Sequence, residues 1–137
     1  MSTIETTYTG GLRTEATHLR SDNKLVTDAP LDNQGKGEYF SPTDLVAAAL
    51  GSCMFTIMGI AARTHNFNID GAKMAITKVM TNEGPRKIAE VIVEITFPDA
   101  DYTEREKKIL DVCARTCPVA LSLHPEVKQT VNLIFRK

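Results

Sequence analysis

The longest apolar segment of the chain, residues 45–62, contains no charged residue. Just before it, Ser41, Pro42 and Asp44 have the spacing of a helix N-cap, a first-turn proline and a capping-box partner. This pattern predicts a helix that runs to about His65. The segment has the minimum length of a membrane span, but charged residues flank it closely and it lacks an aromatic belt. A helix buried on all sides inside a protein therefore fits better.

Alternating or β-rich segments on both sides of this helix predict strands, separated by turns rich in Gly, Pro, Asn and Asp. The expected strands are Ile4–Tyr8, Leu12–Leu19, Lys24–Thr27, Asn68–Thr81, Lys87–Phe97 and Val127–Phe135. An amphipathic helix is expected over Tyr102–Thr116, capped by Thr103, and a short helix over Pro118–Leu123. The order β-β-β-α-β-β-α-β lacks strict βαβ alternation and predicts the α+β class.

The length of 137 residues indicates a single domain, 1–137. So short a chain has little material to surround an apolar helix. Small residues along the helix, among them Ala47, Gly51 and Gly59, would let a second helix approach closely. We therefore expect an intimate homodimer with the two long helices at its centre.

Composition restricts the possible partners and location. Sixteen basic and seventeen acidic residues give a net charge of −1, which argues against nucleic-acid binding. Three cysteines are too few for a disulfide-built fold and favour a reducing compartment, so we expect a cytoplasmic protein that does not bind membranes. Residues 1–10 show no secretory signal pattern.

Cys53 lies within the predicted long helix and has two interpretations. It is either a small buried apolar residue or a nucleophile that reacts as the thiolate. The helix dipole fades beyond the first turn, so a thiolate here needs a cation from elsewhere. Arg13, Arg20 and Arg63 are the candidates, and His18 is a weaker one.

Cys117 precedes Pro118 at a break between two predicted helices, where its side chain would lie at a helix N-terminus and its pKa would fall. Cys113 is expected in the core of the preceding helix. The spacing of these cysteines and His124 does not match a zinc site, so no metal site is expected. A peroxide could oxidise one of two cysteines to a sulfenic acid, which the other would convert to a disulfide.

Two motifs together resemble the OsmC/Ohr family. Residues 41–45 (SPTDL) and 47–53 (AAALGSC) are similar to its first-cysteine helix, and residues 116–119 (TCPV) are similar to its second-cysteine motif. The order of elements also matches over essentially the whole chain. The family includes thiol-dependent hydroperoxide reductases and folds as an interlocked homodimer around two long helices.

The resemblance implies that Cys53 is the peroxidatic cysteine and Cys117 the resolving one. It implies that an arginine of the N-terminal strand region holds the thiolate, with Arg13 the best match and Arg20 the second. It further implies a hydroperoxide substrate, an external thiol reductant such as a lipoylated protein, no cofactor, and a role in oxidative or osmotic stress defence.

One position departs from the organic-hydroperoxide members, which carry a glutamate where this chain has Thr43. At about 100° per residue, Asp44 lies ~180° around the helix from Cys53, whereas Thr43 lies ~80° away. Asp44 is therefore expected to be the cap partner and Thr43 to contact substrate. Glu38, just before the helix, is expected to supply the missing carboxylate.

The aromatic residues Tyr39, Phe40 and Phe55 are either core residues or an apolar wall for the alkyl part of a hydroperoxide. A competing hypothesis for the whole protein is a non-catalytic OsmC-like dimer that binds an apolar ligand or senses redox state, which Thr43 favours. A structural dimer with inert cysteines is another.

Overall fold

The computed structural model describes residues 1–136; Lys137, the last residue of the expected domain, lies outside the described residues. The chain forms two compact units, and the border between them falls after Val46. That border lies within the long helix α1 (Pro42–Thr64), which begins in the first unit and continues in the second.

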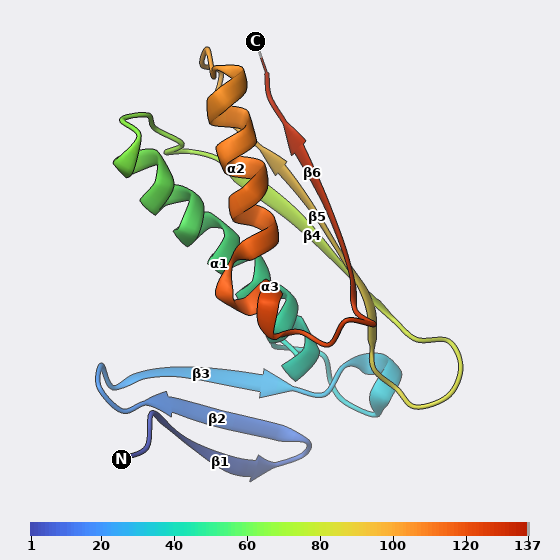
Figure 1. Cartoon of the computed structure of the whole chain (residues 1–137). Coiled ribbons are helices and arrows are strands. Elements are labelled where there is room, and N and C mark those ends of the chain that lie inside the picture. The colour runs from blue at the N-terminus through green and yellow to red at the C-terminus, as the bar shows by residue number, and fades with distance from the viewer. Residues whose placement is uncertain (137) are drawn as a thin grey trace. The chain divides into compact units, whose positions relative to one another are not determined.

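The first unit contains an antiparallel sheet of order β1-β2-β3, made of β1 (Ile4–Gly10), β2 (Arg13–His18) and β3 (Asn23–Asp28) (Figure 1). The register pairs Arg13 with Asp28 across β2 and β3. Most side chains of this sheet are exposed, and the burial is concentrated at the end of β3, at Thr27 and Asp28. The short 3-10 helix η1 (Leu31–Asn33) follows β3.

The start of α1 is closed by a capping box. The Ser41 hydroxyl accepts a hydrogen bond from the Asp44 amide at 3.0 Å, and the Asp44 carboxylate accepts one from the Ser41 amide at 3.0 Å. Two amide groups at the helix start, which have no partners within the helix, are thereby satisfied. This confirms the predicted roles of both residues.

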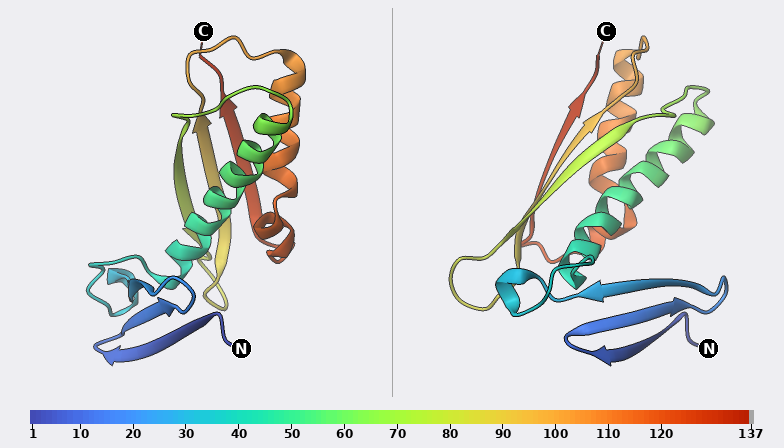
Figure 2. Two further views of the ribbon diagram at one scale, coloured as in Figure 1. Left: turned by 90° about the vertical axis from the view of Figure 1, so that its left-hand side faces the viewer. Right: turned by 180° about the vertical axis from the view of Figure 1, so that it is seen from behind.

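The second unit contains a mixed sheet of order β4-β5-β6, made of β4 (Lys73–Met80), β5 (Ile88–Thr96) and β6 (Lys128–Ile134). β4 and β5 are antiparallel, whereas β5 and β6 are parallel. The parallel pair is joined by α2 (Glu104–Thr116) and α3 (Pro118–Ser122). α1 and α2 cover the same face of this sheet (Figure 2).

The core lies between this sheet and the helices that cover it. Alternate residues of β5, among them Val91 and Val93, are fully buried with Leu50 of α1 and Leu110 of α2. Gly51 allows α1 to lie close to β4, because a Cβ atom there would be 2.5 Å from the side chains of Met74 and Ile76. The α+β class and the predicted order of elements are therefore confirmed.

One sequence-based expectation is wrong in detail. The strand expected from Asn68 begins only at Lys73, because positive φ angles at Asn66 (61°) and Gly71 (91°) turn the chain there. The Asn68 side chain also accepts the Asp70 amide, which stabilises that turn.

This chain alone does not bury α1 on every side, as expected for so short a chain. One face of α1 is buried, while Ser52, Thr56 and Ile60 on another face are exposed. Of the most apolar 18-residue stretch of α1, 33% is buried. By length and composition α1 could cross a membrane, but the core helix of a soluble protein passes the same test.

The capping box predicts the cost of its removal. Ser41→Ala and Asp44→Ala should each lower the free energy of unfolding by about 1 kcal/mol, because each change removes a hydrogen bond of the box. The double variant should lose less than the sum, since the two hydrogen bonds form one unit. Urea denaturation followed by circular dichroism measures all three.

Ser2→Ala is the matched control, because it makes the same chemical change at an exposed position outside every helix and strand. It should leave stability unchanged, since substitutions at such surface positions have little effect. Equal midpoints for Ser41→Ala and Ser2→Ala would contradict a stabilising role for the cap.

Candidate functional site

The second unit brings Cys53 and Cys117 together. Cys53 lies in the middle of α1 and is half-buried, whereas Cys117 is fully buried between α2 and α3. The amide of Val119, two residues after Cys117, donates to Sγ of Cys53 at 3.5 Å, and the neighbouring Cys53 raises the pKa of Cys117. The two cysteines are therefore neighbours, as the peroxide hypothesis requires, and their individual roles stay predictions.

The break between α2 and α3 positions both sulfur atoms. Cys117 has an extended backbone (φ −65°, ψ 150°) and is at once the C-cap of α2 and the N-cap of α3. Pro118 suits the first position of α3, where no amide hydrogen is needed. The Ala120 amide then donates to Sγ of Cys117 at 3.4 Å, and the Val119 amide donates to Sγ of Cys53 at 3.5 Å.

Burial raises the pKa of the Cys117 thiol, and the neighbouring Cys53 raises it further. The hydrogen bond from the Ala120 amide acts in the opposite direction and is the weaker effect. The expectation that a helix N-terminus would lower the pKa of Cys117 is therefore wrong, because desolvation outweighs the amide. Burial also raises the pKa of Cys113, which lies in the core as expected.

The first unit brings Arg13 and Glu38 together. Nη2 of Arg13 lies 2.6 Å from Oε1 of Glu38 and 3.0 Å from Oδ2 of Asp28, while Nε donates to Oδ1 of Asp28 at 3.4 Å. The guanidinium carbon also lies 4.7 Å from the centre of the Tyr39 ring. Arg13 is therefore held by two carboxylates and one aromatic face.

Asp28 is the member of this cluster that the sequence did not single out. Hydrogen bonds from the Arg13 side chain and the Glu38 amide hold the pKa of the Asp28 carboxyl below its usual value. The Asp28 and Glu38 carboxylates in turn raise the pKa of the Arg13 guanidinium above its usual value. Strand register could have identified Asp28 from the sequence, because the hairpin that joins β2 and β3 places Asp28 directly opposite Arg13.

The other candidate cations lie in different surroundings. Arg20 is exposed in the turn between β2 and β3, and Nδ1 of His18 contacts the Ser21 hydroxyl at 2.6 Å. Arg63 lines a hollow of about 420 Å³ near the end of α1, together with Phe55. Of the four candidates, Arg13 is the one paired with the predicted carboxylate Glu38.

The remaining candidates differ in burial. The Thr43 hydroxyl lies 3.2 Å from that of Ser41 at the start of α1. Tyr39 and Phe40 are 50% and 58% exposed, so their interpretation as core residues is wrong, because their segment runs along the surface of the first unit. Phe55 is partly buried and packs against the core.

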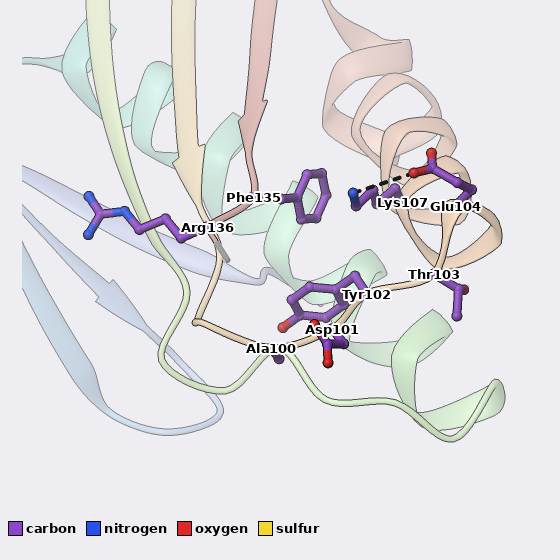
Figure 3. Close-up of a pocket in the computed structure, with 8 residues that line it drawn as sticks. All are labelled: Ala100, Asp101, Tyr102, Thr103, Glu104, Lys107, Phe135 and Arg136. Carbon is purple, nitrogen blue, oxygen red and sulfur yellow. Dashed lines mark ion pairs between the residues drawn. The ribbon is translucent and has the colours of Figure 1, made fainter.

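Another hollow, of about 330 Å³, lies beside the start of α2 (Figure 3). Lys107 and Glu104 form an ion pair of 3.6 Å there, and Tyr102 and Phe135 contribute aromatic rings to its lining. No residue that the sequence predicted for the site is among the described residues that line this hollow.

The environments of the three cysteines predict the order in which they react. At pH 7–8, iodoacetamide should modify Cys53 first, because Cys113 and Cys117 are buried and their raised pKa values keep them protonated in this range. Raising the pH toward 10 should accelerate the two slow reactions. Peptide mass spectrometry after timed quenching measures each rate, and labelling in urea provides the fully exposed control. Faster labelling of Cys117 than of Cys53 at neutral pH would contradict this order.

Solved structures of other proteins share this fold. A protein from Psychrobacter arcticus 273-4, described as an osmotic stress induced and detoxification response protein, is 50% identical with a TM-score of 0.91, over 97% of this chain and 96% of that chain. An OsmC-like protein from Mycoplasma pneumoniae is 17% identical with a TM-score of 0.80, over 98% and 96% of the two chains. An organic hydroperoxide resistance protein OsmC from Legionella pneumophila is 18% identical with a TM-score of 0.74, over 98% of each chain. The last two likenesses show the fold alone.

No curated protein matches the chain. The family model described as OsmC-like protein matches residues 35–132, which include the start of α1, both cysteines of the pair and most of β6. The match covers well over half of the sequence, and the chain therefore belongs to the OsmC-like protein family.

Proposed function

We propose that this protein is a cysteine-based peroxidase that reduces organic hydroperoxides, and also hydrogen peroxide, in defence against oxidative or osmotic stress. The observation that carries the proposal is the proximity of the half-buried Cys53 to the buried Cys117: Sγ of Cys53 accepts the amide of Val119, two residues after Cys117, at 3.5 Å. A disulfide requires two cysteines whose Cα atoms lie within about 7 Å, and this proximity supports such a pairing.

In the proposed cycle, the Cys53 thiolate attacks the distal oxygen of the hydroperoxide and the O–O bond breaks. Cys53 becomes a sulfenic acid, and the leaving alkoxide takes a proton to give the alcohol, or water when the substrate is hydrogen peroxide. Cys117 then condenses with the sulfenic acid, which releases water and forms the disulfide. An external dithiol, such as a lipoylated protein, reduces that disulfide and is itself oxidised, so that no cofactor is needed.

The environment of Cys117 suits the resolving role better than the attacking role. Its raised pKa keeps it a thiol at neutral pH, so it does not compete with Cys53 for peroxide. Its fully buried position next to Cys53 still allows it to react with a sulfenic acid formed there.

In this proposal Arg13 is the cation that holds the Cys53 thiolate, and Glu38 orients Arg13 in place of the glutamate that Thr43 replaces. Arg13 keeps its positive charge throughout the physiological range, as any guanidinium does, and Asp28 and Glu38 raise its pKa further. The substrate's alkyl part would contact Thr43, Phe40 and Phe55. The name of the Legionella relative supports the same class of substrate.

We also propose a homodimer in which the exposed face of α1 packs against a second copy, in the cytoplasm. Ile60 on that face is 58% exposed, and small residues surround it on the helix. Burying such a face removes apolar surface from water and completes the burial that an apolar helix of this length needs.

Mass spectrometry of the pre-reduced protein tests the peroxidase. One equivalent of cumene hydroperoxide should lower the intact mass by about 2 mass units, the two hydrogens lost on disulfide formation. Cys53→Ser should show no change, and Cys117→Ser should gain the mass of one or more oxygen atoms. Cys113→Ser is the matched control and should behave like the unchanged protein.

Turnover distinguishes the enzyme from a sensor or a binding protein. With excess hydroperoxide and a dithiol such as dihydrolipoamide, the peroxidase should consume many equivalents of hydroperoxide per protein. Oxidation that stops after one equivalent despite the dithiol would favour a redox sensor, and no mass change over minutes would leave an apolar-ligand-binding or structural dimer.

The dimer has its own test. Ile60→Asp should shift the protein from dimer toward monomer in sedimentation velocity, because it places a charge in the proposed contact. Val112→Asp makes a comparable change at an exposed site of α2 that is 51% exposed and should keep the dimer. A wild-type monomer at micromolar concentration would contradict the proposed assembly.

A further inference from the structure

The proposed attack by Cys53 needs a thiolate, and the helix around Cys53 carries no charge to stabilise one. Residues 45–62 contain no charged side chain, and Cys53 lies far beyond the first turn of α1, where the helix dipole has faded. The amides of α1 around Cys53 are used for hydrogen bonds within the helix. A stabilising donor from the second unit must therefore come from another element.

The break between α2 and α3 supplies such a donor. The first amides of a helix have no acceptor within the helix, so they are available to other groups. In α3 the first position is Pro118, which has no amide hydrogen. The Val119 amide donates to Sγ of Cys53 at 3.5 Å. The Ala120 amide donates to Sγ of Cys117 at 3.4 Å, so each sulfur has its own backbone donor.

Contacts of α3 fix the direction of the Val119 amide. Gln129 on β6 donates from Nε2 to the Ala120 carbonyl at 3.0 Å, which ties α3 to the sheet. The Ser122 hydroxyl donates to the Pro118 carbonyl at 2.7 Å and holds the first turn together. A backbone donor that is held in this way needs no side-chain rearrangement when a negative charge forms next to it.

The hydrogen bond from the Val119 amide favours the thiolate over the thiol. A hydrogen bond to an ionised acceptor is about twice as strong as one between neutral groups. Cys117 is the titratable side chain next to Cys53 in the described part of the second unit, and burial keeps it a neutral thiol at pH 7. The helix α3 has five residues, too few for a substantial dipole, so the effect comes from the hydrogen bond itself.

We propose that the backbone amide of Val119 is a catalytic group of this site, which donates to the Cys53 sulfur and stabilises the thiolate that attacks the hydroperoxide. The inference rests on the proposed role of Cys53 as the attacking cysteine. The amide keeps its own hydrogen throughout. The Cys53 proton passes to water before the attack, an S–O bond then forms as the O–O bond breaks, and the leaving alkoxide takes a proton from water.

Replacing the peptide bond between Pro118 and Val119 by an ester removes this donor. A synthetic peptide of residues 117–137 with the ester can be joined to a thioester of residues 1–116, because Cys117 supplies the cysteine that native chemical ligation requires. The pH profile of Cys53 alkylation by iodoacetamide should move to higher pH. Alkylation at pH 7 should slow by about tenfold, the change that one pKa unit produces.

The reference is the ligated protein with all its peptide bonds intact. The rates of the ester protein and the reference should converge at high pH, where Cys53 is ionised in both. A general loss of structure would not produce this convergence, so the profile separates a catalytic role from a structural one. An ester protein with the profile of the reference would overturn the proposal.

Three control proteins isolate the amide of Val119. An ester at the next peptide bond removes the Ala120 donor, and it should shift the alkylation profile of Cys117 but not that of Cys53. Ser122→Ala tests the weaker carbonyl of an ester, because it removes the hydroxyl that contacts that carbonyl. Val119→Ala changes the side chain and keeps the amide. Both substitutions should leave the Cys53 profile unchanged.

A measurement with the ordinary backbone covers the case in which the ester protein does not fold. In Cys117→Ser, whose hydroxyl also suits an N-cap, Cys53 is the remaining thiol of the pair. The nuclear magnetic resonance signal of the Val119 amide should move as the pH rises, with the midpoint of the Cys53 alkylation profile. The Leu121 amide donates to the carbonyl of residue 117, so its signal should stay in place. A Val119 signal that does not move through this midpoint would contradict the proposed hydrogen bond to the thiolate.

The two proposals fail separately. If hydroperoxide turnover is present but the ester leaves the Cys53 profile unchanged, the peroxidase stands and the amide is not a catalytic group. If turnover is absent but the profile shifts, the hydrogen bond to the thiolate stands and the proposed peroxidase falls.

Discussion

The break of the helix at Cys117 is the feature on which the cysteine pair depends. Pro118 starts a new helix immediately after α2 ends, and the extended backbone of Cys117 between them lets the first amides of α3 meet two sulfur atoms. The other half of the arrangement is the close approach of α1 to β4 at Gly51, two residues before Cys53. The proximity of the two cysteines is therefore a consequence of core packing.

The different burial of the two cysteines gives them different reactivities. A fully buried thiol with a raised pKa is a poor nucleophile toward peroxide in solution, whereas a half-buried thiol on the adjacent helix is accessible. The asymmetry arises from desolvation, which at Cys117 outweighs the hydrogen bond from Ala120. The proposed order of events, with Cys53 first and Cys117 second, follows from this difference and from the family resemblance together.

The starts of α1 and α2 could be predicted from sequence, because helix caps depend on residue type and short spacing. The residues that indicated caps were Ser41, Asp44 and Thr103, and the structure has both capping boxes. The strand expected from Asn68 was placed too early, because Asn68, Asp70 and Gly71 are turn residues and form a turn before Lys73. The predicted direction of the Cys117 pKa was wrong for a different reason, since desolvation depends on residues distant in sequence.

The group formed by Arg13, Asp28 and Glu38 could be predicted only in part from the sequence. A carboxylate was sought for Arg13 because Thr43 stands where relatives have glutamate, and Glu38 does contact Arg13. The second carboxylate, Asp28, depends on strand register, which a single sequence specifies poorly. An arginine with two carboxylates carries a net negative environment, so it attracts a further anion only when one partner leaves. The exposed Glu38 is the partner whose loss would cost least, because water can replace it, whereas the buried Asp28 carboxylate depends on Arg13 for its compensation.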